Sequence, residues 1–248
     1  MSRVTKPSEP IFNVPGVVLA TIAALVIVHV GRALLLTPDE DIDLLIEFAF
    51  IPARYGGSSL PREAFPGGIA ADAWTFVTYA LLHGNVWHLV VNSVWLLPFG
   101  SAVARRFGSL RFLLFLVLTA AAGAGMHLAT NLGAPVPMIG ASAAISGCMA
   151  AAMRFVFQAG GPLTVFRRDI DPQAYLVPAA PLTAVWHDPR ILAFLAIWFG
   201  LNILFGLGSV AIPGAEQAVA WQAHIGGFIA GLFLFSAFDR GVPNESRP

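Results

Sequence analysis

The amino-acid sequence predicts an all-α integral membrane protein with about six membrane-spanning helices. Of its 248 residues, 57% are hydrophobic and only 11% are charged, whereas about 25% of the residues in an average soluble domain are charged. The mean hydropathy of the chain is +0.74. Most of the apolar residues fall in six segments, each close to the length of about 20 residues that an α-helix needs to cross a bilayer.

The six predicted spans are separated by loops that contain proline, glycine or arginine. They cover residues 14–36, 85–104, 112–130, 142–158, 191–207 and 218–238. The first span follows Arg3 and Lys6, as the apolar part of a signal peptide would. However, it is longer than the roughly 7–15 residues typical of that part. It is therefore interpreted as an uncleaved span.

The lysine and arginine residues are distributed unevenly between the two ends of the predicted spans. One side holds most of them: Arg3, Lys6, Arg105, Arg106, Arg111, Arg154, Arg167, Arg168, Arg190, Arg240 and Arg247. The other side holds Arg32, Arg54 and Arg62. Because cytoplasmic loops carry an excess of Lys and Arg, we expect both termini in the cytoplasm, as tails over residues 1–13 and 239–248. No basic cluster with interleaved aromatic residues suggests nucleic-acid binding.

The membrane domain is expected over residues 14–238, with a long external loop over residues 37–73. This loop combines an apolar stretch, residues 44–55, with a group of acidic residues and several glycines and prolines. The apolar stretch predicts a partly helical flap that lies against the outer leaflet. The acidic residues have no regular metal-ligand spacing, so they are interpreted as a solvated edge.

The second predicted span carries two polar side chains on one face, because His88 and Asn92 are four residues apart. His83 lies shortly before them. A polar side chain at membrane depth can bond a neighbouring helix, although ionisable groups there are also functional candidates. Three histidines share no pattern with another span: His29, His127 and His187. They are interpreted as structural residues that bond a neighbouring helix.

The sixth predicted span carries His224, followed on the same side by Gly227 and Gly231. A Gly-x-x-x-Gly pattern lets two membrane helices approach closely. We therefore expect this span to press against a neighbour and to hold His224 near it.

The fourth predicted span opens with a run of small residues, Gly140-Ala141-Ser142-Ala143-Ala144-Ile145-Ser146-Gly147. Small residues and buried serines are common where membrane helices pack, so packing alone could explain both hydroxyls. The alternative is a nucleophile, which needs a base and an oxyanion site elsewhere. Cys148 is the only cysteine, so an intramolecular disulfide is excluded, and it is interpreted as a small apolar helix residue.

Three spans together offer the parts of an acyl-transfer site. His224 would accept the proton of the Ser142 hydroxyl and return it to the leaving amine. The Ser142 backbone N–H at a helix N-terminus, with Asn92 and His88, would bind the oxyanion. No Asp or Glu lies in the spans near these residues, which predicts a Ser–His dyad. A Gly-x-Ser-x-Gly motif fails at Ala144, which argues against a soluble α/β hydrolase.

In these residues the chain resembles the rhomboid intramembrane serine proteases. The resemblance covers about residues 74–238 and implies a compact six-helix bundle. It also implies an active site sunk below the outer surface and reached by water from that side. The match rests on Gly140-Ala141-Ser142, on His83, His88 and Asn92, and on Ala223-His224-x-x-Gly227-x-x-x-Gly231.

The resemblance also implies roles for individual residues. Ser142 would be the nucleophile and His224 the base, with His88 and Asn92 in the oxyanion site. Supporting positions would be His83, Gly140, Gly227 and Gly231. Ser146, one turn after Ser142 on the same face, is interpreted as a packing residue that could also support the base from beneath. Such a protein is expected to be multi-pass in a bacterial inner membrane and to cleave other membrane proteins in or near their transmembrane segments. It is expected to need no metal or organic cofactor.

The sequence departs from the pattern of this family at three places. Ala143 stands where relatives usually have glycine after the nucleophile, and Ser146 where many have an aromatic ring against the catalytic imidazole. We therefore expect a hydroxyl group or water to orient His224. In the first loop, Trp74-Thr75 stands where many relatives have Trp-Arg.

The alternatives to a protease are a catalytically inactive relative and a transporter. A catalytically inactive relative would bind transmembrane clients without cutting them, but such proteins typically lose the serine or histidine that this chain retains. A transporter would more often show paired carboxylates, broken helices and an internal repeat, and the sequence has none of these.

Overall fold

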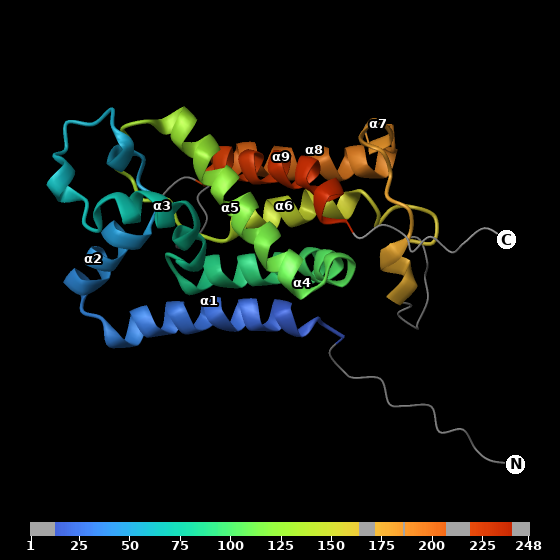
Figure 1. The fold of residues 1–248 in the computed structure, drawn as a ribbon, viewed down its shortest axis with the longest axis horizontal. Coiled ribbons are helices and arrows are strands. Elements are labelled where there is room, and N and C mark those ends of the chain that lie inside the picture. Colours follow the sequence, from blue (N-terminus) through green and yellow to red (C-terminus); the bar gives the residue numbers. More distant parts are fainter. Residues whose placement is uncertain (1–12, 164–171, 186, 207–218, 240–248) are drawn as a thin grey trace, which may run out of the picture.

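The protein folds into a helical bundle (Figure 1). The computed structural model describes residues 13–163, 172–185, 187–206 and 219–239. Apart from Asn13 and Asp239, the two predicted tails therefore lie outside the described residues.

Four helices in the described part of the chain are long and apolar enough to cross a bilayer. They are α1 (Gly16–Leu35), α4 (Val86–Phe107), α5 (Ser109–Asn131) and α9 (Trp221–Phe238). Local sequence explains where they begin and end. Pro15 precedes α1, and Gly108 separates α4 from α5 with a φ of 81°, a conformation that glycine adopts without steric cost.

Two further apolar helices, α6 (Ser142–Met153) and α8 (Pro189–Gly206), complete the bundle. The fourth span was predicted to reach residue 158, but α6 ends at Met153. Its 12 residues rise about 18 Å, which is less than the thickness of the hydrocarbon core. Every residue of α6 after Ser142 is buried, so this helix is enclosed by protein and does not need the length of a lipid-facing span.

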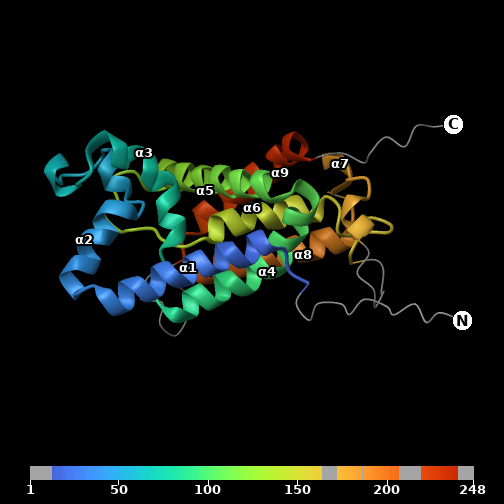
Figure 2. The ribbon, with the colours of Figure 1, turned by 60° about the horizontal axis from the view of Figure 1, so that its bottom comes forward.

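Helix α6 lies between α4, α5 and α9, as two views of the ribbon show (Figures 1 and 2). Glycine makes this close packing possible. A Cβ atom added at Gly231 of α9 would lie 2.3 Å from the Gly147 carbonyl oxygen of α6, and one added at Gly147 would lie 2.5 Å from the Thr119 side chain of α5. The bundle therefore packs backbone against backbone at its centre, as close-packed membrane helices do.

Helix α1 runs along α4 at the edge of the bundle (Figure 2). Only Val18 and Leu25 of this helix are buried. Most of its other apolar side chains face outward, as expected for a helix that contacts lipid on most of its surface.

The external segment, defined as residues 37–81, gathers at the end of the bundle opposite α7 (Leu182–Val185) (Figure 1). It contains α2 (Pro38–Phe48), α3 (Gly68–Thr78) and three short 3₁₀ helices: η1 (Pro52–Tyr55), η2 (Arg62–Ala64) and η3 (Tyr79–Leu81). A capping box begins α2, with the Thr37 side chain bound to the Glu40 backbone and the Glu40 side chain bound to the Thr37 backbone.

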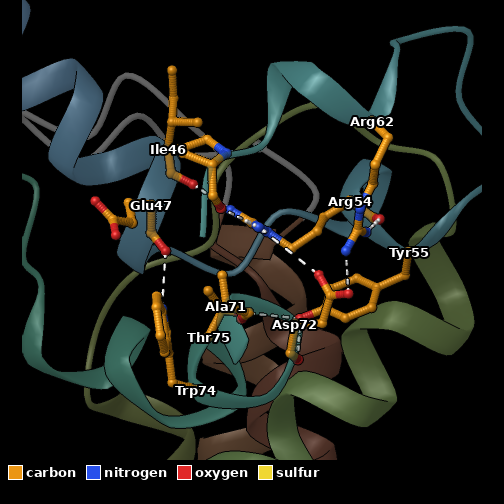
Figure 3. Close-up of polar contacts among 10 residues, drawn as sticks. Ile46, Glu47, Arg54, Tyr55, Arg62, Ala71, Asp72, Trp74 and Thr75 are labelled. Atoms are coloured by element: carbon orange, nitrogen blue, oxygen red, sulfur yellow. Dashed lines mark hydrogen bonds and ion pairs between the residues drawn. The ribbon is translucent and has the colours of Figure 1, made fainter. Parts of the chain in front are cut away.

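Arg54 lies at the centre of the external segment (Figure 3). The residue is only 2% exposed, and its side chain donates hydrogen bonds to the carbonyl oxygens of Ile46 (2.7 Å) and Pro66 (2.9 Å). The Asp72 carboxylate lies 3.8 Å away and also binds Arg62. Burial lowers the pKa of the Arg54 guanidinium, although Tyr55 and Asp72 oppose this shift. Arg54 therefore anchors the external segment, although Thr75, and not an arginine, follows Trp74.

The external segment also holds the loop that leads into α6. Phe50 and Met138 exchange two backbone hydrogen bonds, of 3.1 and 2.8 Å, and the Gly140 N–H donates to the Tyr79 carbonyl at 3.0 Å. The start of α6 is thus fixed by backbone contacts from residues about 60 to 90 positions earlier in the chain.

Most of the described arginines gather at the opposite end of the bundle, beside η4 (Pro172–Leu176) and α7. Arg106 forms two hydrogen bonds with the Asp239 carboxylate, of 2.9 and 2.8 Å, and donates to the carbonyl oxygens of Tyr175 and Val177. Arg154 donates to the Ala180 carbonyl at 2.6 Å. These side chains join the cytoplasmic ends expected for α4, α6 and α9.

Candidate active site

The site begins with two side chains from different helices. The Ser142 hydroxyl oxygen at the start of α6 lies 2.7 Å from Nε2 of His224 in α9. This is a normal hydrogen-bond distance, and it is the contact that proton transfer from a serine to a base requires. Both residues are partly exposed.

Gly227 explains how His224 comes so close to Ser142. A Cβ atom added at Gly227 would lie 2.0 Å from the Ala143 carbonyl oxygen, so only glycine allows α9 this close to α6. His224 precedes this contact by three residues and therefore lies beside the first turn of α6. Gly231 repeats the approach one turn further on, as the Gly-x-x-x-Gly pattern predicts.

A third polar residue, Asn202 of α8, contacts the other side of the histidine ring. Its Oδ1 atom lies 2.5 Å from Nδ1 of His224, and its Nδ2 atom donates to the Trp198 carbonyl at 2.8 Å. Asn202 is not among the site residues predicted from the sequence, because the absence of Asp and Glu from the spans predicted a dyad without a third member. The signal was present, since Asn202 is an amide in an otherwise apolar span.

The two residues predicted for the oxyanion site lie beside the loop before Ser142. A Cβ atom added at Gly140 would lie 2.6 Å from His88 Nε2 and 3.9 Å from Asn92 Nδ2. Asn92 donates one amide hydrogen to the His88 carbonyl at 2.9 Å. An amide NH₂ group carries two donor hydrogens, so this bond uses one of them.

The N-terminus of α6 supplies further donors. The first N–H groups of a helix have no partner within it, and no side chain from the described residues caps α6. The helix dipole also favours negative charge at this end. An anionic oxygen next to Ser142 would therefore meet backbone donors in addition to His88 and Asn92.

His83 lies next to His88, with ring centroids 5.0 Å apart. It also borders a cavity of about 250 Å³ whose lining includes Arg32 and Asp41. Arg32 donates to the His83 carbonyl at 3.0 Å and forms two hydrogen bonds with the Asp41 carboxylate. This contact attaches the junction of α1 and α2 to the start of α4.

The two departures inside α6 have structural explanations. A Cβ atom added at Gly123 of α5 would lie 2.5 Å from the Ala143 methyl group, so that methyl group packs on Gly123. Ser146 donates to the Ser142 carbonyl at 2.8 Å, the back-bonding that a buried serine in a helix often makes. A hydroxyl group or water was expected to orient His224, but the Ser146 hydroxyl binds the Ser142 carbonyl, and the group that contacts the His224 ring is the Asn202 amide.

Comparison with known proteins places this site in a family. The family described as the Rhomboid domain matches residues 70–239, well over half of the chain. Rhomboid protease GluP of Bacillus subtilis is 40% identical over 170 residues, which are 68% of this chain and 26% of that protein. RHOMBOID-like protein 4 of Arabidopsis thaliana is 24% identical over 236 residues, and Rhomboid protease GlpG of Enterobacter is 26% identical over 176 residues.

The chain aligns with only part of each of these relatives. The alignment with the Arabidopsis protein covers 89% of this chain, and the alignment with the Enterobacter protein covers 69% of it. Each alignment covers 51% of the relative's own length. The matched region of the family nevertheless contains every residue of the site, from His83 to Gly231. The chain therefore belongs to the rhomboid family.

Proposed function

We propose that the protein is an intramembrane serine endopeptidase that cleaves transmembrane proteins with a Ser142–His224 dyad. The observation that carries this proposal is the 2.7 Å contact between the Ser142 hydroxyl and His224 Nε2 at the N-terminus of a buried helix. A serine hydroxyl is a weak nucleophile until a neighbouring base accepts its proton, and this contact supplies the base. Two of the relatives are named as rhomboid proteases.

The reaction would proceed in two stages. In the first, the Ser142 oxygen attacks the scissile carbonyl carbon while His224 Nε2 takes the hydroxyl proton. The proton then passes to the amine of the breaking C–N bond, which leaves an acyl-enzyme and a new N-terminus. In the second, His224 takes a proton from water, the hydroxide attacks the ester carbonyl, and the proton returns to the Ser142 oxygen.

The tetrahedral intermediates of both stages carry a negative oxygen. We infer that the Ser142 N–H, the second amide hydrogen of Asn92 and the His88 ring donate hydrogen bonds to it. Their placement around Gly140 supports this role. Replacing Asn92 with alanine is expected to reduce kcat by about 10²–10³, the loss measured for single oxyanion donors in other enzymes, while labelling of Ser142 by a fluorophosphonate persists.

The first test is labelling and cleavage in detergent. Wild-type protein should react with a fluorophosphonate probe and cut a model transmembrane substrate, and Ser142→Ala and His224→Ala should do neither. Ser101→Ala is the matched control, because Ser101 is a buried serine of α4. Undiminished cleavage by Ser142→Ala would contradict the proposed mechanism. A wild-type protein that retains a transmembrane client without cutting it would favour an inactive, client-binding relative instead.

We further propose that both termini face the cytoplasm of a bacterial cell and that the external segment faces outward. The excess of arginine at the opposite end of the bundle supports this orientation. Cys148 is the only cysteine and is fully buried, so a Ser59→Cys variant carries a single exposed thiol. A membrane-impermeant maleimide should label this variant in intact spheroplasts; labelling only after lysis would reverse the orientation.

A further inference from the structure

The hydrogen bonds of Asn202 determine which way its side chain points. The Trp198 carbonyl, 2.8 Å from Nδ2, can only accept a hydrogen bond, so the amide nitrogen must face it. A reversed amide would bring two oxygen atoms together. The amide oxygen of Asn202 therefore faces Nδ1 of His224, at 2.5 Å.

This orientation determines the protonation of the neutral His224 ring. An amide oxygen cannot donate, so Nδ1 must carry the hydrogen. A neutral imidazole has one N–H, and Nε2 is then left with its lone pair. Nε2 is the atom that lies 2.7 Å from the Ser142 hydroxyl, so the ring is held in the one tautomer that can accept the serine proton.

We propose that Asn202 is a positioning residue for peptide-bond hydrolysis, because its side-chain oxygen holds His224 in the base-competent tautomer and ring orientation. This inference rests on the proposed protease function. Asn202 does not touch the reacting atoms and acts only through His224. The same logic, a third group that orients the base of a nucleophile, recurs in serine and cysteine hydrolases on unrelated folds, including some that use asparagine.

The position of Asn202 is itself well defined. Asn202 is only 7% exposed and continues a stripe of buried residues along α8. Its neighbours in the chain, Leu201 and Ile203, are exposed. The stripe consists of Ile191, Leu195, Trp198 and Asn202. Trp198 stacks on Phe228 of α9, with centroids 4.8 Å apart and an interplanar angle of 29°. α8 is therefore packed against α9 one turn away from the Asn202–His224 contact.

A hydrogen-bonding role and a packing role for Asn202 predict opposite rankings of variants. Asn202→Leu keeps the volume but removes the oxygen, and Asn202→Ala removes both. Asn202→Asp keeps an oxygen facing Nδ1, and in its protonated form the second oxygen can still donate to the Trp198 carbonyl. If the oxygen positions His224, Leu and Ala should both lower kcat by about 10–10² with KM unchanged, because general-base catalysis depends on alignment. Asp should retain at least about tenfold more activity than Leu. If Asn202 only fills space, Leu should resemble wild type and the buried carboxylate of Asp should be the most harmful.

The experiment measures kcat and KM for cleavage of a transmembrane substrate, together with the rate of fluorophosphonate labelling and the melting temperature in detergent. Ile203→Ala, on the exposed face of α8, is the matched control and should leave all four quantities unchanged. Wild-type kcat in Asn202→Leu, or lower activity in Asn202→Asp than in Asn202→Leu, would overturn the inference while leaving the protease function intact. Inactive wild-type protein that resists labelling would overturn both.

Discussion

The helical bundle and the external segment are held together by opposite means. In the bundle, α6 and α9 approach so closely that the Gly227 and Gly231 positions leave no room for a methyl group. In the external segment, a buried arginine fills the centre and binds backbone carbonyl groups of two separate turns. The centre of the bundle packs closely because glycine has no side chain at these positions, whereas the external segment packs around one long charged side chain.

The difference follows from where the backbone hydrogen bonds go. The long helices satisfy their own N–H and C=O groups, as a membrane requires, so their surfaces can meet without polar partners. In the external segment, the last turn of α2 and the turn before α3 leave carbonyl groups, Ile46 O and Pro66 O, that need donors from elsewhere. A guanidinium carries five N–H donors in a fixed planar arrangement and can serve several carbonyls at once.

The proposed active site lies where these two regions meet. Ser142 begins α6, a member of the bundle, while Met138 and Gly140 are bound by Phe50 and Tyr79 of the external segment. Breaking the bundle should therefore remove the site altogether. Loosening the external segment should leave the dyad present but disturb the loop that precedes it.

The largest effect is expected from Gly231→Ala. The added methyl group would lie 2.3 Å from the Gly147 carbonyl oxygen and 2.5 Å from its Cα atom. These are backbone atoms of a fully buried helix, so the two helices must separate. We expect a loss of about 3 kcal/mol in the free energy of unfolding, at the upper end of the usual overpacking penalty. SDS titration in mixed micelles measures it.

The control for this variant is Gly125→Ala in α5, where an added methyl group has no neighbour within 4 Å. This change should alter the free energy of unfolding by at most about 1 kcal/mol, because only the helix propensity changes. Equal effects of the two substitutions would show that the close packing of α6 and α9 does not stabilise the bundle.

The sequence allowed much of the bundle to be predicted, because lipid contact leaves a strong signal. Helices α1, α4, α5 and α9 follow the predicted spans to within a few residues. The largest excess was at α6, which was predicted to reach residue 158 but ends at Met153, and this helix is enclosed by protein. Ser142, His224, His88 and Asn92 stood out for the same reason, since polar groups are rare in apolar spans.

Arg54 and Asn202 show what sequence reasoning could not supply. The partners of Arg54 are backbone carbonyl groups, which every residue has, so no residue pattern marks them. Asn202 carried a visible signal, but its distance to His224 depends on how α8 packs on α9. In both cases the contact is set by tertiary structure rather than by spacing along the chain.

The next largest effect is expected from Arg54→Met, which keeps an apolar stem but leaves the Ile46 and Pro66 carbonyl groups without this donor. An unsatisfied buried polar group costs about 1–3 kcal/mol. We expect faster hydrogen exchange and proteolysis between residues 37 and 78, with α5, α6 and α9 still protected. Arg62→Met should have a smaller effect, because Arg62 is exposed. Uniform loss of protection across the bundle would show that the two regions unfold together.

A smaller and more local effect is expected from Gly140→Ala. Gly140 has a φ of 116°, and an added methyl group would lie 2.6 Å from His88 Nε2. We expect kcat to fall about tenfold because an oxyanion donor is displaced, with a stability loss of about 1 kcal/mol for the backbone conformation. The control is Gly68→Ala, where φ is 58° and the space is open. This variant should show the backbone strain without the loss of kcat. Equal kcat values in the two variants would show that the contact with His88 does not affect catalysis.

The smallest effect is expected from acid at the start of α2. Hydrogen bonds from the Thr37 backbone and side chain hold the pKa of Glu40 below its ordinary value. A carboxylate whose pKa is lowered in the folded state stabilises it above the unfolded pKa, and this contribution is lost as pH falls through the folded pKa. The Thr37 amide should therefore lose exchange protection between about pH 5 and about pH 3, after correction for intrinsic rates. In Glu40→Gln the side chain can still accept from Thr37 but does not titrate, so protection should be independent of pH; the same acid-induced loss in this variant would assign it to another group.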